Sequence, residues 1–268
     1  MTAHAHPASA RRLTVRLARD AADLDAVQRL RWRVFFEEMG ADADPANAAV
    51  RCDRDAYDAL CDHLLVIDEA RYEASGQAED AVVGTYRLLR EKVAQAHDGF
   101  YSAGEYHIAP LMQAREDGRE LLELGRSCVL PEYRTSATIS MLWRGIADYI
   151  KANHIGLMFG CASFAGTDPD VYAPALSYLY HHHLAPADQR PCVLPGKGVA
   201  MERLAPGTYD ERRAMFQLPP LVKGYMRVGA KFGDGAFIDH AFNTVDVFVV
   251  MPVDLIADRY ASRFSAAA

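Results

Sequence analysis

The apolar residues near the start of the chain recur every three or four positions, as they do along one face of a helix. This spacing predicts a first helix over Asp23–Glu38, which Asp20 can cap. Two runs of strand-forming residues follow, His63–Asp68 and Ala81–Leu89, and they predict strands. The polar stretch 69–80 between them is expected to be a hairpin connection or a mobile loop.

The middle of the chain alternates between strand and helix patterns. Leu121–Leu130 is an apolar run of strand length, Ile139–Ala152 has helical periodicity, and Gly156–Phe164 is a second strand-like run. A strand, a loop, a helix and a strand in this order predict a crossover unit of an α/β sheet.

The last third of the chain mixes helix, loop and strand signals. Asp170–Tyr180 can be helical, whereas the prolines and glycines of residues 181–199 predict a loop. Pro219–Phe232 begins with prolines suited to a helix start, and Phe242–Val253 is a late strand rich in β-branched and aromatic residues.

No linker composition or internal repeat divides the chain. Its 268 residues, half of them hydrophobic, can bury a large core. The sequence therefore predicts one mixed α/β domain over residues 1–268, with a C-terminal helical elaboration and a flexible N-terminus at 1–20. No apolar run is long enough to cross a membrane, and the first residues lack the apolar core of a signal peptide, so we expect a cytoplasmic protein.

Charge and cysteine usage narrow the classes of partner. A net charge of −7 argues against nucleic acid as the main partner, because phosphate binding needs a concentrated basic footprint. The cysteines are odd in number and form no C-x-x-C pair, which argues against a disulfide framework and against a zinc ribbon. We expect reduced thiols, mostly in the core, at Cys52, Cys61, Cys128, Cys161 and Cys192.

One carboxylate and one guanidinium interrupt the apolar run LELGRSCVL. Glu123 and Arg126 face opposite sides of a regular strand, but a β-bulge near Gly125 would bring both to one cleft. An ionised carboxylate in a strand core is costly unless it is paired or used. The pair therefore indicates either a structural ion pair or a functional site.

Several segments carry a resemblance to known enzymes. LRWRVFFEEMGA, DRDAYDALCDHLLV, VVGTYRLL, ELGRSCV, LWRGIADYI, FGCASF and PPLVKGYMRVGAKF followed by FNTVDVFVV occur in this order between about Leu24 and Val250. Together they resemble the acyl-homoserine lactone synthases and, more closely, the ornithine N-acyltransferases, which are both groups of the GNAT superfamily.

The resemblance implies a GNAT-like mixed sheet with a V-shaped splay between two central parallel strands, here LELGRSCVL and LMFGCASF. It also implies transfer of a 3-hydroxylated fatty acyl group from acyl carrier protein to the α-amine of ornithine, the first step of ornithine lipid biosynthesis. No bound cofactor is implied, because the donor is the phosphopantetheine thioester of the carrier protein.

The resemblance also suggests which residues bind the donor. Relatives that use coenzyme A have a glycine-rich loop after the first arm of the V, where this chain has PEYRTSATIS. A carrier-protein pantetheine carries one phosphodiester, which Arg134 and Ser136 can bind at the helix start. The alternative is that Arg134 is a solvated loop residue.

Acylation of an amine requires a base and a group that stabilises an oxyanion. Glu123 is the candidate base, with binding of the substrate ammonium or pairing with Arg126 or Arg87 as its alternatives. Backbone N–H groups where the strands splay are expected to meet the oxyanion, at Ser127, Cys128 and Val129. A covalent acyl-cysteine is disfavoured, because no histidine is placed to activate Cys128 or Cys161.

Ornithine brings a second ammonium, so its pocket should contain carboxylates. Asp55 and Asp58 match the acidic motif that shapes the cleft of the lactone synthases, together with the arginines that correspond to Arg33 and Arg87. Asp246 in the late strand is another candidate.

A basic stripe on the predicted helix suggests a docking surface. Lys223, Arg227 and Lys231 recur every four residues. Such a stripe is either a solvated face or a site that binds the acidic surface of acyl carrier protein or the anionic inner membrane.

Other motifs carry no function. His181–His183 lacks carboxylates or cysteines spaced to complete a metal site, and PGKG lacks the rest of a P-loop, so we expect neither metal nor nucleotide. Three alternative functions stay open: an acyl-homoserine lactone synthase acting on S-adenosylmethionine, an enzyme that acylates glycine or another amino acid, and a non-catalytic membrane-binding protein.

Overall fold

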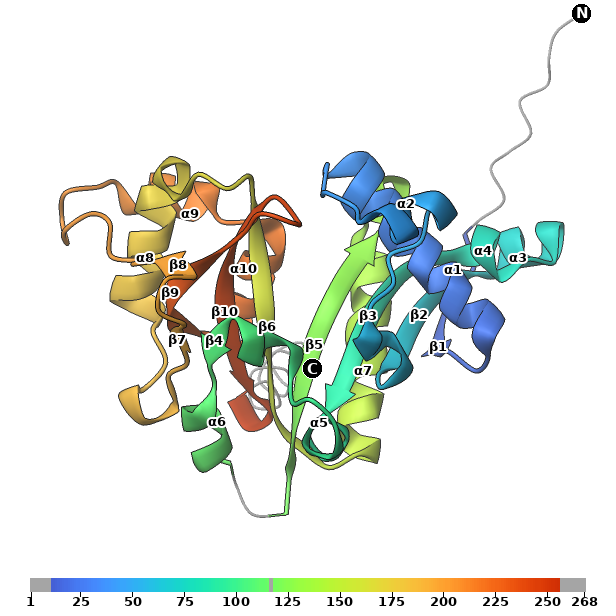
Figure 1. The fold of residues 1–268 in the computed structure, drawn as a ribbon, viewed down its shortest axis with the longest axis horizontal. Coiled ribbons are helices and arrows are strands. Elements are labelled where there is room, and N and C mark those ends of the chain that lie inside the picture. The colour runs from blue at the N-terminus through green and yellow to red at the C-terminus, as the bar shows by residue number, and fades with distance from the viewer. Residues whose placement is uncertain (1–10, 116–117, 256–268) are drawn as a thin grey trace, which may run out of the picture.

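A long mixed β-sheet runs through the protein, whose computed structural model describes residues 11–115 and 118–255 (Figure 1). The strand order is β1-β2-β3-β5-β6-β10-β9-β7-β4, and β8 pairs with β9 beside this path. Neighbouring strands are antiparallel except in the pairs β5–β6 and β7–β9, which are parallel. The strands are β1 Leu13–Leu17, β2 Asp62–Asp68, β3 Val82–Arg90, β4 Tyr106–His107, β5 Glu120–Val129, β6 Ile155–Ala165, β7 Cys192–Val193, β8 Gly198–Val199, β9 Lys231–Asp239 and β10 Thr244–Pro252.

Helices lie on both faces of this sheet, with α1 in front of and α7 behind the β1–β3 half in Figure 1. The α-helices are α1 Ala21–Trp32, α2 Pro45–Val50, α3 Glu69–Ser75, α4 Ala78–Ala81, α5 Glu91–Ala96, α6 Ala109–Gln113, α7 Ser136–Ala152, α8 Ala173–His183, α9 Glu211–Gln217 and α10 Pro220–Arg227. A π-helical turn, η1 Arg33–Glu38, continues α1, and short 3-10 turns are η2 Ala56–Ala59, η3 Tyr101–Gly104, η4 Pro131–Tyr133, η5 Pro169–Tyr172 and η6 Ala187–Gln189.

The two central parallel strands separate part of the way along their length. Their ladder runs from the pair Glu120–Ile155 to the pair Glu123–Phe159, whereas β5 continues to Val129 and β6 to Ala165. Figure 1 shows the two strands diverging toward the end that carries α2. The splay predicted between LELGRSCVL and LMFGCASF is thereby confirmed.

A glycine marks the point of divergence. A Cβ atom on Gly160 would lie 2.1 Å from the carbonyl oxygen of Leu124, far inside a van der Waals contact. The backbones of β5 and β6 therefore lie too close at this point for a side chain between them, and a glycine is required there.

Most of the predicted elements are present, and α7 begins at Ser136 because Thr135 caps it through its side chain. The stretch 69–80 joins β2 and β3, which pair antiparallel, so the prediction of a hairpin connection is confirmed, although α3 and α4 form this connection instead of a loop. Within the stretch expected to be flexible, 1–20, Leu13–Leu17 pairs with β2 as β1, and residues 1–10 lie outside the described part.

The predicted helix over Pro219–Phe232 is too long. The structure ends α10 at Arg227, and Gly229 with φ 94° turns the chain so that β9 starts at Lys231. Residues 181–199, expected to be a loop, contain the end of α8, a 3-10 turn and the short strands β7 and β8.

Candidate active site

Glu123 lies at the point where the two strands separate. Its Oε2 accepts a hydrogen bond from the backbone N–H of Tyr101 at 2.7 Å, and its Oε1 accepts one from the N–H of Ser102 at 2.8 Å. The side chain is 5% exposed. Burial raises the pKa of this carboxyl, and the hydrogen bonds from Ser102 and Tyr101 oppose that rise. Glu123 therefore fixes η3 against the sheet and has the raised proton affinity of a general base.

A β-bulge follows directly. Gly125 lies opposite Arg87 and Cys128 opposite Thr85, so β5 has one residue more than β3 across this interval. Arg126 occupies the bulge with a left-handed φ of 49°. The prediction of a bulge near Gly125 is confirmed.

The bulge brings Arg126 to the same turn that Glu123 binds. The guanidinium lies 4.9 Å from the ring centre of Tyr101 and 4.3 Å from that of Phe242. Its contacts with Asp53 and Asp55 are 3.3 Å and 3.4 Å long. Glu123 and Arg126 are thus on one side of the sheet without a direct ion pair, which answers the question that their spacing raised.

The acidic motif is part of a buried ion network. Arg87 bonds both oxygens of Asp55 at 2.7 Å and 2.6 Å and one oxygen of Asp58 at 3.1 Å. Arg31, fully buried, donates to both oxygens of Asp58 at 2.9 Å and 2.7 Å and contacts Asp53 at 2.9 Å. Burial by itself raises the pKa of Asp58, but Arg31 and Arg87 hold it well below its usual range.

The carboxylates of Asp55 and Asp58 are therefore already paired with arginines, and both also form the capping box of η2. Arg33, predicted to line the cleft, instead donates to the backbone carbonyl of Glu79 at 2.9 Å on the side of α4. Arg31 takes the place predicted for Arg33. The sequence could have indicated that Arg31 is buried, since it follows Val27 by four residues on the apolar stripe of α1.

A second group of acids lies on the other arm of the splay. Glu105 follows η3 and accepts a hydrogen bond from the Cys161 thiol at 3.4 Å. Burial and the nearby Asp246 raise the pKa of Glu105 to about 8, and burial raises that of Asp246 to about 6. Asp246 was predicted from the sequence, whereas no local pattern distinguishes Glu105.

The candidate phosphate ligands lie at the start of α7. Arg134 bonds both carboxylate oxygens of Glu38 at 2.6 Å and 2.7 Å and also donates to the carbonyl of Val129. Ser136 is the exposed first residue of the helix. A phosphate bound here would meet free N–H groups at the helix start and would compete with Glu38 for Arg134.

The thiols of the two arms are not activated. Burial raises the pKa of Cys128 to about 12 and that of Cys161 well above the ordinary thiol value. The side chain of Cys128 therefore packs in the core, and the backbone at Ser127, Cys128 and Val129 lies beyond the last pair of the ladder with β6.

The three predicted docking cations do not form one helical stripe. Lys223 donates to the carbonyl of Phe216 at 3.0 Å, Arg227 ends α10, and Lys231 belongs to β9. The helical spacing that suggested a common face is wrong beyond Arg227.

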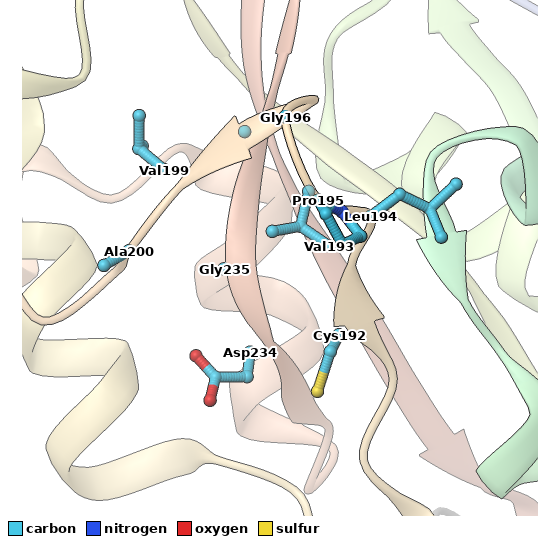
Figure 2. A pocket seen from close by; sticks show the side chains of 10 residues that line it. Cys192, Val193, Leu194, Pro195, Gly196, Val199, Ala200, Asp234 and Gly235 are labelled. Atoms are coloured by element: carbon cyan, nitrogen blue, oxygen red, sulfur yellow. The ribbon is translucent and has the colours of Figure 1, made fainter.

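Two surface hollows lie away from the splay. One of about 240 Å³ lies between β7, β8 and β9 and is lined by Cys192, Asp234 and the loop 193–200 (Figure 2). The other, of about 150 Å³, adjoins Arg119 and Gly156 near the starts of β5 and β6. Neither hollow is lined by Glu123 or Arg126, which lie where β5 and β6 separate, a point called the branch from here on. The candidate site is therefore the branch itself, where the two strands stop pairing and the polar side chains gather.

Of the residues the structure describes, none forms a helix long and apolar enough to cross a membrane. Within the same residues, no three histidine, cysteine, aspartate or glutamate side chains are arranged to hold a metal ion.

The chain is similar to several known proteins. The acetyltransferase (GNAT) domain matches residues 30–144. An L-ornithine N(alpha)-acyltransferase of Agrobacterium fabrum is 50% identical over 94% of this chain and 85% of its own length. An enzyme of the same name from Rhizobium meliloti is 46% identical over 95% and 84%. Among solved structures, the CoA-dependent acyl-homoserine lactone synthase BjaI gives a TM-score of 0.48 at 14% identity, covering 93% of this chain and 89% of that one.

Proposed function

This chain belongs to the family of L-ornithine N(alpha)-acyltransferases, and on that premise we propose that it acylates the α-amine of ornithine. The donor is a 3-hydroxylated fatty acyl thioester of acyl carrier protein, and the reaction, which needs no bound cofactor, begins ornithine lipid synthesis. The identity of 50% over 94% of the chain carries the proposal. The splay supports a thioester donor, because it leaves unpaired backbone groups along both arms.

The chemistry follows from the groups at the branch. An α-amino group has a pKa of about 8, so a modest base suffices near neutral pH. Glu123 removes the proton directly or through one water, and the neutral amine attacks the thioester carbonyl. Backbone N–H groups of Ser127, Cys128 or Val129 stabilise the oxyanion. The C–N bond forms, the C–S bond breaks, and the pantetheine thiolate leaves and takes up a proton.

The phosphopantetheine arm and the carrier protein are bound by cationic residues outside the branch. Arg134 and Ser136 bind the single phosphate at the start of α7, with Arg134 exchanging Glu38 for it. Lys223, Arg227 and Lys231 contribute positive charge toward the acidic carrier protein without forming one face.

The product is an amphiphile, and we propose peripheral binding to the inner membrane face. Phe216 of α9 is 84% exposed, and Met215 and Val171 are exposed as well. Arg212 and Arg213 precede Met215 and Phe216 on α9. Exposed apolar side chains beside cations are typical of a surface that binds anionic lipid.

The test is mass spectrometry of the purified protein with 3-hydroxyacyl carrier protein and a mixture of ornithine, lysine, glycine and S-adenosylmethionine. We expect N-acyl-ornithine as the product. Acyl-homoserine lactone or an N-acyl-glycine would replace the proposed acceptor, and the absence of every acylated product would contradict the enzymatic function.

A matched pair of variants tests the role of Glu123. Glu123→Gln should lower the rate roughly 100-fold or more, as loss of a general base does. Glu91→Gln is the control, because Glu91 is equally buried and accepts the N–H of Leu121 at 3.1 Å at the other end of β5. Equal losses in both variants would show that Glu123 has only a structural role.

A further inference from the structure

Beyond the branch, the face that carries Glu123 continues onto β6 and β10 as an acidic surface. The thiol of Cys161, two residues past Phe159, bonds Glu105 at 3.4 Å. Asp246 of β10 lies opposite Ser163 of β6, on the same face as Cys161. Glu105 and Asp246 are 9% and 7% exposed, whereas Ser163 is exposed, so the group reaches solvent beside it.

Three buried oxygens in this region make no hydrogen bond of ordinary length and angle among the described residues, although the hydroxyls of Thr244 and Ser163 lie close enough to lower the pKa of Asp246, and that of Ser102 lies close enough to lower the pKa of Glu123. They are Oδ1 of Asp246, Oγ1 of Thr244 and Oγ of Ser102. Thr244 is two residues from Asp246 on the same face of β10, and Ser102 donates its N–H to Glu123. A buried carboxylate oxygen without a well-placed donor costs free energy, so Oδ1 of Asp246 indicates a missing donor.

The carboxyl groups also lack a counter-ion. No described lysine or arginine lies within ion-pair distance of Glu105 or Asp246, although Arg126 acts on Asp246 from further away. Asp239 and Glu123 add negative charge nearby. Burial raises the pKa of Glu105 and that of Asp246, and no cation beside them offsets this rise, since Arg126 lowers the pKa of Asp246 only from a distance.

The group lies next to the proposed base. Glu123 is the last residue of β5 paired with β6, and Cys161 is the second residue of β6 beyond that pair. An amino acid whose α-amine is at Glu123 extends its side chain along this face.

We propose that Glu105 and Asp246, with the hydroxyl of Thr244, bind the side-chain ammonium of the acceptor, which must therefore be a diamino acid. This inference rests on the proposed function and deepens it. The ammonium supplies three N–H donors, one of them to Oδ1 of Asp246, and a positive charge to two carboxyls that have no counter-ion beside them. An acceptor with an apolar side chain would leave these groups buried and unpaired, which is a strong basis for rejection.

The experiment compares ornithine with L-norvaline, which has the same carbon chain without the terminal amine. Asp246→Asn and Glu105→Gln are measured with both acceptors, and Asp234→Asn of β9 is the matched control outside the group. For ornithine we expect kcat/KM to fall roughly 10- to 100-fold, chiefly through KM, as loss of a hydrogen bond to a charged group does. On this inference norvaline is a poor acceptor for the parent protein, so we expect no further loss of kcat/KM with it in the variants. A circular dichroism spectrum equal to that of the parent shows that the variants are folded.

Equal losses with both acceptors, or no loss with ornithine, would overturn the inference while leaving the proposed function intact. A parent protein that does not acylate ornithine would instead refute the proposed function.

A second measurement needs no variant. Glu105, with a pKa of about 8, holds a proton at pH 7, so calorimetry in buffers of different ionisation enthalpy should detect proton release on binding ornithine and none with norvaline. Identical proton release with both would also contradict the inference.

Discussion

Replacing Arg31 by methionine tests whether the buried ion network stabilises the protein. Arg31 has no exposed surface and neutralises two carboxylates that are themselves 3% and 4% exposed, Asp53 and Asp58. Methionine fills a similar volume without charge, so the variant leaves both acids in place with one cation fewer. The same acids position Arg87 and Arg126 at the branch, so activity should fall together with stability.

The magnitude follows from the contacts that remain. Removing one partner of a buried ion pair costs about 3–5 kcal/mol, because the other charge stays buried without compensation. Asp58 keeps Arg87 at 3.1 Å and Asp53 keeps Arg126 at 3.3 Å, which places the expected loss near the lower limit, about 3 kcal/mol. Arg31→Lys should lose less, because it retains the charge but cannot bind Asp58 through two nitrogens.

The assay is urea unfolding at pH 7 and at lower pH, followed by circular dichroism. The folded-state pKa of Asp58 is lowered, so its contribution is complete above the unfolded pKa of about 3.9 and is lost as the pH falls below that value. The difference between parent and Arg31→Met should therefore narrow below about pH 4. A loss under about 1 kcal/mol at pH 7, or a loss that does not change with pH, would refute the reasoning.

Three further changes test other parts of the structure. Gly160→Val should cost about 2–3 kcal/mol and most of the activity, because its Cβ would collide with the carbonyl oxygen of Leu124, and an unchanged melting temperature would contradict the close approach. A maleimide at pH 7.5 should label the exposed Cys192 in the folded protein and Cys128, with its pKa near 12, only after unfolding, as peptide mass spectrometry can show. Arg134→Gln should raise KM for the acyl carrier protein several-fold with little change in kcat, and an unchanged KM would argue against the phosphate role.

The strands of the splay could be predicted from the sequence because their signals are local. Leu121–Leu130 and Gly156–Phe164 are apolar runs separated by a helical pattern, which fixes a crossover between neighbours in one sheet. Gly125 beside two charged residues likewise suggested the bulge. The helices within the polar stretch 69–80 could not be predicted, because both are short: Asp68 caps α3, and α4 packs on α1, which is distant in sequence.

The full set of site residues could not be predicted, because it depends on which segments meet in the fold. Glu105 lies in a loop without periodicity, and only the pairing of β6 with β10 places it beside Cys161 and Asp246. Arg33 and Arg31 are two positions apart on one helix, so a motif match alone does not decide which of them enters the network.

The broken ladder between β5 and β6 gives the protein two open sheet edges in its interior. Edge strands normally lie at the margin of a sheet, where they invite pairing with another chain. Here the two edges face each other across the splay instead of facing solvent at the margin of the sheet. Their backbone groups can therefore bind a narrow ligand that carries amide groups. A donor of this kind completes a sheet that the polypeptide leaves unfinished, so its binding should raise the melting temperature as well as supply the acyl group.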